Sequence, residues 1–443
     1  MNNNLNRLLG VSVINEGVSE QPHRNEFYTN YPSYKYWGKN DNSKLFSSPG
    51  INIYIHIPFC IQICDYCFYM KELVKSKDQI NTYVDFLCKE IELVSKRFNL
   101  KDKKVNSIYI GGGTPSVLTE TQFKRLTETL HQWHNIQELE FTIEAEPGTF
   151  SKNKLQCYKE IGVNRLSMGI QSFDDEVIKL SSRKHSSMQA LNSISLAKEN
   201  GAFQVNIDLL SGLAGETMSS WIKTLEIAFE QRVDMLTIYK MKAYSNTVFF
   251  QKGVYDNKIE LPSSEQEIEF MKKALETAGE KKYGMWSTFA FNLNGSQSKY
   301  IEHTWRGEDL IAYGASSFGR IREINYQNLN NINAYYEKIS QEELPLYRSF
   351  ALSVKDQIVR EILLCSARLF SYRKSEFVSK FGFDYFDLIP EMIEQLVELG
   401  YIEQSKEELI LTSQGILFGD FVSKLLAESV KNILGRDKID FKY

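Results

Sequence analysis

The sequence predicts an α/β fold: a partial (β/α)6 barrel of the TIM type with parallel strands, an N-terminal arm and a C-terminal, mostly helical, winged-helix-like domain. The first observation is a recurring unit, in which a short run rich in Ile, Val, Tyr and Thr precedes an amphipathic polar stretch. Strands that alternate with helices form a parallel sheet covered by helices. The second observation is that the unusual short motifs follow these runs, where active sites of such barrels lie. The strand-like runs span 51–57, 107–112, 140–146, 165–170, 204–210 and 235–241.

The composition is ordinary for a soluble globular protein, with 443 residues and a formal net charge of -4. This balance gives no reason to expect a nucleic-acid or membrane partner. No apolar run is long enough to span a membrane, and the polar N-terminus lacks the core of a signal peptide. We therefore expect a cytoplasmic monomer, and in a reducing cytoplasm structural disulfides are not expected.

Residues 1–50 are expected to form an extended arm. Asn, Ser and Tyr are frequent in it, and Pro22 and Pro32 interrupt regular structure. The aromatic cluster at 27–37 is too apolar for a free tail. We therefore expect the arm to pack on the barrel, which is predicted to span 51–325.

Three of the six cysteines, Cys60, Cys64 and Cys67, follow the first strand-like run. A structural zinc ion takes four ligands, so a zinc site would need a distant fourth residue. A redox pair of Cys64 and Cys67 would leave Cys60 without a role. A four-iron cluster held by three thiolates keeps one iron open for a substrate or cofactor. The incomplete ligand set therefore indicates catalysis, while the zinc and redox alternatives stay open.

Two further motifs follow the second and third runs. The glycine triplet of GGGTPS, residues 111–116, lets the backbone approach a ligand closely, and Thr114 with Pro115 fits a helix start. Glu144 and Glu146 lie two residues apart on a strand, so both carboxylates are expected on one face. A carboxylate accepts two hydrogen bonds and suits the hydroxyls of a ribose. The alternatives are a tight turn and a solvated strand end.

From residue 353 onward the pattern becomes helical, with a hairpin-like segment at 401–415. We assign residues 326–443 to a C-terminal domain that resembles a small winged helix. Winged helices often bind nucleic acid, but this segment holds more Asp and Glu than Lys and Arg, and a negative surface repels phosphates. We expect a structural or substrate-covering role instead.

The spacing Cys-x3-Cys-x2-Cys, with Tyr66 before the third cysteine, resembles the radical S-adenosylmethionine (SAM) superfamily. The flanking YIHIPFC resembles its HemN/HemW-like branch, which contains oxygen-independent coproporphyrinogen III oxidases, haem chaperones and related methylases. The resemblance runs from about Tyr28 to the C-terminal helices. It implies a [4Fe-4S] cluster on Cys60, Cys64 and Cys67, whose open iron chelates SAM, and cleavage of SAM to a 5′-deoxyadenosyl radical. A small-molecule substrate and an electron donor such as flavodoxin or ferredoxin are the implied partners.

The same resemblance assigns roles to residues at the other strand ends. Residues matched to the first SAM are Tyr54, Gly112, Glu144 and Phe318. Residues matched to a second SAM, where one is bound, are Tyr66, Gly113, Thr114, Gln171, Arg183 and Asp208. Relatives not shown to need a second SAM also carry the Gln, Arg and Asp, so these residues permit a second molecule without requiring it.

Two departures from the family pattern bear on the reaction. Tyr69 stands where the oxidase carries a further cysteine, and Lys240 stands where it has a small residue. With the divergent segment 285–305, they favour transfer of a SAM-derived methyl group, or carbon–carbon bond formation, on a small organic substrate. The alternative is oxidative decarboxylation of coproporphyrinogen III to protoporphyrinogen IX in haem biosynthesis, because 27–33 resembles the oxidase's N-terminal segment. A haem-binding chaperone is the second alternative.

Overall fold

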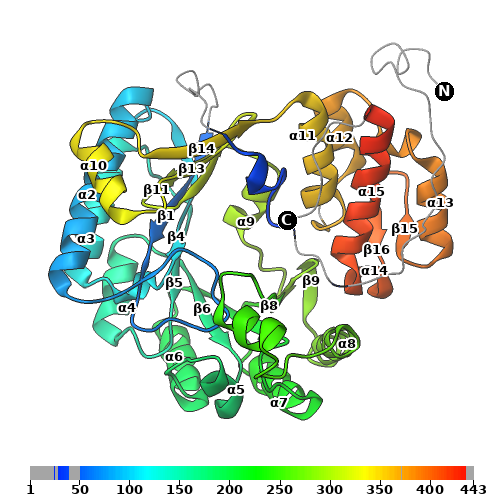
Figure 1. Ribbon diagram of the computed structural model, residues 1–443, viewed down its shortest axis with the longest axis horizontal. Helices are drawn as coiled ribbons and strands as arrows, with labels where there is room; N and C mark the ends of the chain where they lie inside the picture. The colour runs from blue at the N-terminus through cyan, green and yellow to red at the C-terminus, as the bar shows by residue number, and fades with distance from the viewer. Residues whose placement is uncertain (1–23, 25–27, 39–49, 371, 436–443) are drawn as a thin grey trace. The chain divides into compact units, whose positions relative to one another are not determined.

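The computed structural model describes residues 24, 28–38, 50–370 and 372–435 (Figure 1). The chain divides into two compact units, which we name the barrel unit and the C-terminal unit. The described residues of the barrel unit lie within Lys39–Gly284 and Ala290–Ser349. Those of the C-terminal unit lie within Met1–Gly38, Met285–Phe289 and Phe350–Tyr443.

All six predicted strands are present, and each pairs in parallel with the next. Their central residues, such as Ile53, Ile108 and Leu166, are fully buried, as expected for a sheet covered by helices. The predicted α/β class with a parallel sheet is confirmed. The strands are β1 (Gly50–Ile57), β4 (Lys104–Gly112), β5 (Glu140–Ala145), β6 (Arg165–Gln171), β7 (Gln204–Ser211) and β8 (Met235–Lys240).

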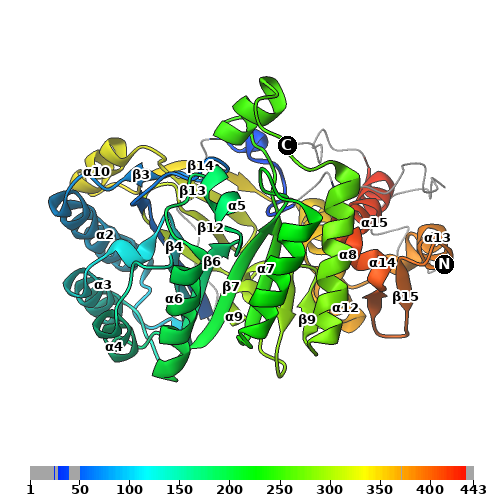
Figure 2. The same cartoon turned by 90° about the horizontal axis from the view of Figure 1, so that it is seen from below.

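Helices between these strands cover the outer face of the sheet (Figures 1 and 2). Several begin at a hydroxyl side chain that accepts a hydrogen bond from the first turn, as Thr119 and Ser186 do. Among the described helices, none combines the length and the apolar character needed to span a bilayer. The helices are α2 (Lys77–Phe98), α3 (Glu120–Trp133), α4 (Lys152–Glu160), α5 (Asp175–Leu180), α6 (Ser187–Asn200), α7 (Met218–Glu230) and α8 (Ser264–Glu280).

The sheet extends beyond the six predicted strands on both sides. β10 (Ala290–Asn292) pairs antiparallel with β8, and β11 (Leu310–Tyr313) pairs parallel with β1. Beyond β11 the strand order continues through β12 (Phe318–Ile321), β13 (Ile324–Asn328) and β14 (Leu346–Ala351). Because β13, helix α10 (Ile332–Ser340) and most of β14 belong to the barrel unit, the C-terminal unit resumes at Phe350, later than the predicted boundary at 325/326.

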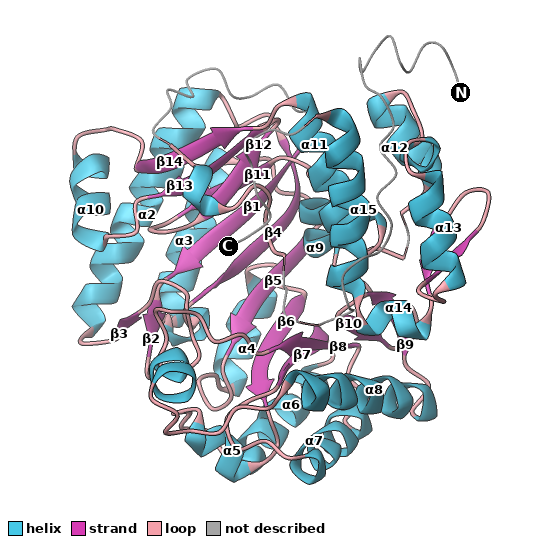
Figure 3. Cartoon of the chain, turned by 45° about the vertical axis from the view of Figure 1, so that its right-hand side comes forward, coloured by secondary structure: helices cyan, strands magenta, loops and turns pink. Residues whose placement is uncertain are grey.

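The C-terminal unit is mostly helical, as predicted, with one small antiparallel hairpin (Figure 3). The hairpin follows α13, which agrees with the predicted order of helices before a hairpin-like segment. Its helical elements are α11 (Val354–Glu361), the π-helical η4 (Ile362–Ser366), α12 (Lys374–Phe381), α13 (Pro390–Glu398), α14 (Ser413–Leu417) and α15 (Gly419–Leu434). Its hairpin strands are β15 (Ile402–Gln404) and β16 (Leu409–Leu411).

Only part of the predicted arm is described, because residues 1–23, 25–27 and 39–49 lie outside the described residues. Arg368 donates to the Tyr28 carbonyl and pairs with Asp420, and the Tyr31 hydroxyl lies 3.4 Å from Asp356. The prediction placed the arm on the barrel, whereas these contacts join its described part to the C-terminal unit. The reason is Arg368, whose side chain is 1 % exposed and therefore needs buried partners.

The buried carboxylate of Glu90 joins helix α2 to the turn after β11, the end of β13 and helix α10. It accepts hydrogen bonds of 2.7 Å each from the Gly314 N–H, the Asn328 amide and the Tyr335 hydroxyl. Burial raises the pKa of Glu90 to about 7, against the opposing effect of these hydrogen bonds. Glu90 therefore fixes the turn after β11 to the helix layer.

We expect Glu90→Gln to flatten the pH dependence of stability. With a pKa of about 7 in the folded protein and 4.5 as its ordinary value, Glu90 stays protonated in the fold where it ionises in the unfolded chain. The free energy of unfolding of the wild type should therefore fall by up to about 3 kcal/mol as the pH rises through this window. Urea unfolding of the wild type and of Glu90→Gln at both ends of this pH window measures the free energy of unfolding. An equal change of this free energy with pH in both proteins would contradict the prediction.

Candidate active site

The loop after β1 carries the three clustered cysteines at the carboxyl edge of the sheet. It contains β2 (Phe59–Cys60), which pairs in parallel with β3 (Glu72–Leu73). Cys60 is buried, Cys64 and Cys67 are half-buried, and all three are free thiols. Across the described part of the chain, no three His, Cys, Asp or Glu side chains are grouped closely enough to hold a metal ion.

The three thiols nevertheless lie within electrostatic range of one another. Burial raises the pKa of Cys60 to about 12, and Cys67 and Cys64 add to the rise. Burial also raises the pKa of Cys67, while Lys71 acts to lower it. The Cys64 Sγ accepts a hydrogen bond from Arg183 Nη1 at 3.5 Å. Arg183 beside Cys64 and Lys71 beside Cys67 place positive charge next to two of the three thiols, and iron–sulfur clusters are bound by anionic thiolates.

The glycine triplet packs directly on the cysteine loop. The Gly113 N–H donates to the Ile57 carbonyl at 2.8 Å, and a Cβ on Gly113 would lie 2.9 Å from the Cys60 Sγ. Gly112 has a φ of 115°, and a Cβ there would lie 2.5 Å from the His56 ring. Both positions therefore require glycine, because any side chain would push the end of β4 away from the cysteines.

Glu144 reaches the same glycine loop from the end of β5. Its carboxylate accepts hydrogen bonds from the Gly112 N–H at 3.0 Å and the Tyr109 hydroxyl at 2.7 Å. Burial raises the pKa of Glu144 to about 7, and nearby Asp208 adds to the rise. The Tyr109 ring stacks near Tyr54 at a centroid distance of 6.2 Å. The structure therefore brings Tyr54, Gly112 and Glu144 together, and their role in binding SAM stays a prediction.

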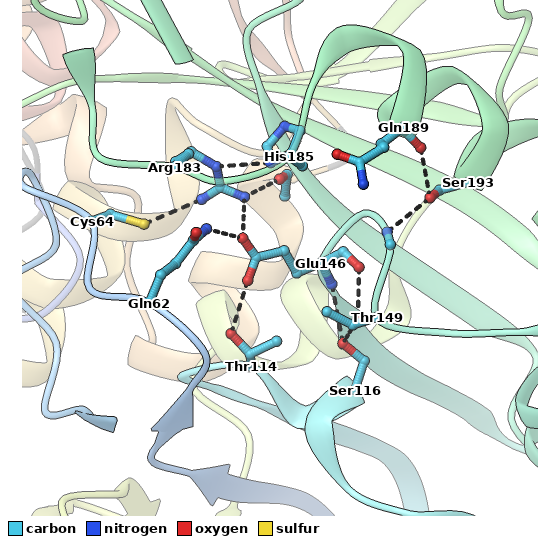
Figure 4. A network of polar contacts seen from close by, with 12 residues as sticks. Gln62, Cys64, Thr114, Ser116, Glu146, Thr149, Arg183, His185, Gln189 and Ser193 are labelled. Atoms are coloured by element: carbon cyan, nitrogen blue, oxygen red, sulfur yellow. Dashed lines mark hydrogen bonds and ion pairs between the residues drawn. The ribbon is translucent and has the colours of Figure 1, made fainter. Parts of the chain in front are cut away.

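Arg183 links the cysteine loop to the ends of β5 and β6 (Figure 4). Its guanidinium donates to the Tyr66 hydroxyl at 2.9 Å and to the Gly169 carbonyl at 2.6 Å. It also lies 3.3 Å from the Glu146 carboxylate, and the two side chains are only 7 % and 9 % exposed. Since a buried charge needs a partner, the ion pair holds Arg183 beside Cys64.

Glu146 is a site residue to which the sequence gave no role of its own. Besides Arg183, its carboxylate accepts hydrogen bonds from the Gln62 amide and from the Thr114 hydroxyl, the latter at 3.4 Å (Figure 4). Its backbone N–H donates to the Ser116 hydroxyl at 3.1 Å. Its spacing from Glu144 was the only signal in the sequence, and nothing there indicated Gln62.

Asp208 and Gln171 lie on the next strands of the barrel. The Asp208 carboxylate accepts hydrogen bonds of 2.9 Å from Ser167 and Asn206, and burial raises its pKa. Gln171 ends β6 with a φ of 69°, in the left-handed region that side chains seldom occupy. Gln171 therefore lies on the strand of Gly169, beside β5 with Glu144, and Asp208 lies on β7, the next strand of the barrel unit.

The sequence also singled out Lys240 and Phe318. Lys240, which stands where the oxidase has a small residue, forms a 2.7 Å ion pair with Glu267 of α8, and both side chains are nearly buried. Its ammonium is thus neutralised by the helix layer. Phe318 is the first residue of β12, which β11 separates from β1 in the sheet order.

Comparison with known proteins supports these observations. The model of the Radical SAM superfamily matches residues 54–228. The heme chaperone HemW of Bacillus subtilis is 30% identical over 374 residues, which cover 83% of this chain and 97% of that protein. The oxygen-independent coproporphyrinogen III oxidase of Salmonella typhimurium is 28% identical over 385 residues, 83% of each chain. The solved structure of coproporphyrinogen III oxidase HemN from Escherichia coli matches with a TM-score of 0.78 and 23% identity, over 93% of this chain and 99% of that one.

The fold, the cysteine loop and the matched family model together define a radical SAM protein. Within that superfamily, the chain belongs to the HemN/HemW-like family. Its cofactors are therefore a [4Fe-4S] cluster and SAM. The predicted methyl or carbon–carbon bond transfer receives no support from these relatives, which agree better with the two alternatives, the oxidase and the haem chaperone.

Proposed function

We propose that the protein is a radical SAM enzyme that acts on a tetrapyrrole, in the manner of an oxygen-independent coproporphyrinogen III oxidase. The observation that carries this proposal is the buried contact of Arg183 with Cys64, Tyr66 and Glu146. Arg183 donates to the sulfur of a cluster ligand, and hydrogen bonds to cluster sulfurs tune the reduction potential that an enzyme needs to cleave SAM. The tetrapyrrole class is supported by relatives named for haem and for coproporphyrinogen.

In this proposal five of the predicted residues have a defined task. Cys60, Cys64 and Cys67 bind three irons of the cluster, which with SAM supplies the radical that removes hydrogen from the substrate. Gly112 lets the end of β4 pass close to the His56 ring, and the Glu144 carboxylate, held by the Gly112 N–H, accepts hydrogen bonds from the ribose of SAM. The hydrogen bonds to the ribose hold SAM in one orientation.

Arg183 and Glu146 act on the cluster ligands rather than on SAM. Arg183 donates to the Cys64 Sγ, and hydrogen bonds to cluster sulfurs change the reduction potential of the cluster. Glu146 fixes the guanidinium in place through the buried ion pair. An external electron donor of the flavodoxin or ferredoxin kind, the monomeric state and the cytoplasmic location remain predictions.

We expect Glu144→Ala to weaken SAM binding by about 100-fold, because two charge-assisted hydrogen bonds to the ribose are lost. With the pKa of Glu144 raised to about 7, its carboxylate form grows as the pH rises, so wild-type affinity for SAM should increase through neutral pH. Glu144→Gln, which cannot ionise, should lose this dependence. Equilibrium SAM binding to the reconstituted protein measures both effects, and a parallel loss of iron would instead show a structural role.

The proposed function is tested by anaerobic reconstitution with iron and sulfide, followed by reduction in the presence of SAM and coproporphyrinogen III. With an electron acceptor added to take the electron that each substrate radical releases as it loses carbon dioxide, we expect 5′-deoxyadenosine together with carbon dioxide and protoporphyrinogen IX. SAM labelled in its methyl group tests the methyl-transfer hypothesis in the same reaction, because label in the product would establish methyl transfer instead. Absence of any change in the tetrapyrrole would contradict the proposal.

A haem carrier is the second candidate function. Several of the relatives that cover most of this chain are named heme chaperones. This candidate predicts tight binding of haem and transfer to an acceptor without turnover of SAM. Absorbance titration with haem, beside the product analysis, separates the two candidates.

A further inference from the structure

Three aromatic rings, here named the aromatic shelf, lie beside the cysteine loop: Phe68, Tyr69 and Tyr244. Phe68 and Tyr69 directly follow Cys67, and Tyr244 comes from the segment after β8. The Phe68 ring stacks on Tyr69 with a centroid distance of 4.2 Å and an interplanar angle of 29°. The Tyr244 ring lies 4.2 Å from the Phe68 centroid. Tyr69 is 53% exposed, while the other two rings are half-buried. The shelf therefore exposes the flat ring of Tyr69, which stacks on Phe68, and Phe68 in turn packs against Tyr244.

Hydrogen bonds hold the shelf beside the cysteine loop. The Asn246 amide donates to the Phe68 carbonyl at 3.2 Å, and the Phe249 N–H donates to the Asp65 carbonyl at 3.0 Å. Both donors lie in the segment that follows β8, so the shelf stands at the carboxyl edge of the barrel strands, where substrates of such folds bind.

The Tyr69 hydroxyl lies near the barrel interior. Burial raises the pKa of Tyr54 on β1 and of Tyr239 on β8, and the Tyr69 hydroxyl adds to the rise in both. Tyr54 also stacks near Tyr109, whose hydroxyl donates to Glu144. The shelf thus borders the same space as the residues assigned to SAM.

A cation accompanies the shelf. The Lys242 Nζ lies 5.7 Å from the centroid of the Tyr244 ring, within the range of a cation–π contact. The shelf therefore combines a flat aromatic surface with one neighbouring positive charge, which suits a flat ring that carries a carboxylate.

Building on the proposed function, we propose that the aromatic shelf stacks on one pyrrole ring of the tetrapyrrole and that Lys242 binds a carboxylate carried by that ring. Pyrrole rings are flat π systems, and the side chains of coproporphyrinogen and haem end in carboxylates. The shelf begins one residue after Cys67, so a ring bound there lies at the cluster end of the site. Tyr69 and Lys242 would then be specificity residues of the reaction.

The stacking part is tested by fluorescence titration of the reconstituted full-length protein with coproporphyrin III, the stable oxidised form. We expect Tyr69→Ala to weaken binding about tenfold and Tyr69→Phe to preserve it. Tyr244→Leu, which removes a supporting ring away from the cysteines, should also weaken binding. Tyr255→Ala is the matched control, because Tyr255 is a 76% exposed tyrosine on η3 (Phe250–Tyr255). Equal affinities of the wild type, Tyr69→Ala and Tyr244→Leu would overturn the stacking.

The charge part is tested with Lys242→Met and the tetramethyl ester of coproporphyrin III, which lacks carboxylates. The variant should bind the free acid more weakly than the wild type does, yet bind the ester equally well. An equal loss for both compounds would overturn the role of Lys242. Iron content should be unchanged in every variant, which excludes damage to the cysteine loop.

The outcomes also separate this inference from the function on which it rests. Binding of coproporphyrin by the wild type that is insensitive to Tyr69 and Lys242 would overturn the shelf and leave the proposed function standing. Failure of the wild type to bind either coproporphyrin or haem would overturn both. Binding of haem alone, with the same dependence on Tyr69, would support the shelf and favour the carrier.

Discussion

Replacement of any one of Cys60, Cys64 and Cys67 by Ala is expected to prevent cluster assembly and to reduce SAM cleavage to background. Three thiolates are the smallest set that leaves a single iron open for SAM. Removal of one opens a second iron to solvent, and metal binding by such a loop is cooperative with its local folding. Iron and sulfide content after anaerobic reconstitution, with 5′-deoxyadenosine as the product measured, checks this result for each variant.

Cys88→Ala is the matched control for these three variants. Cys88 is also a half-buried free thiol, but it lies on the outer helix α2, away from the strand ends. We expect it to retain iron and full SAM cleavage. Full iron content in any variant of the three loop cysteines would contradict the cluster assignment, and loss of iron in Cys88→Ala would show that the fold, and not the ligand set, had failed.

The barrel core could be predicted from the sequence because its strands are apolar, contiguous and punctuated by polar ends. The run at 140–146, for example, corresponds to β5, Glu140–Ala145. The outer strands β10 to β13 escaped prediction because each is only 3 to 5 residues long, as in Ala290–Asn292. A strand that short carries too little periodicity to be separated from a loop. The boundary at 325/326 was placed too early because α10 and most of β14, which follow it in the chain, belong to the barrel unit.

Site residues could be predicted where they lie in a short motif with a recognisable spacing. The three cysteines, the glycine triplet and Glu144 each follow a strand within a recognisable motif. The partners of Glu146 were not predictable in the same way, because Arg183 and Gln62 reach it from different loops that only the folded sheet brings together. The pairing of Lys240 with Glu267 was missed for the same reason, since the carboxylate lies on the following helix.

Arg183→Met is expected to lower the free energy of unfolding by about 3–5 kcal/mol, the usual cost of breaking a buried ion pair from one side. The change leaves the Glu146 carboxylate, 9 % exposed, without its positive partner, and it removes the donors to Tyr66 and Gly169. Urea unfolding of the protein without its cofactors measures the fold alone, and iron content after reconstitution measures the consequence for the cluster.

Two further variants show whether the cost comes from the stranded charge. In Arg183→Met with Glu146→Gln, no carboxylate is left unpaired, so the double variant should be more stable than Arg183→Met alone. Arg125→Met is the surface control, because Arg125 pairs with Asp85 at 54% and 42% side-chain exposure and should cost about 0.5 kcal/mol or less. If Arg183→Met cost no more than Arg125→Met, the ion pair would not hold the cysteine loop. If the double variant were no more stable than Arg183→Met, the loss would instead come from the hydrogen bonds to Tyr66 and Gly169.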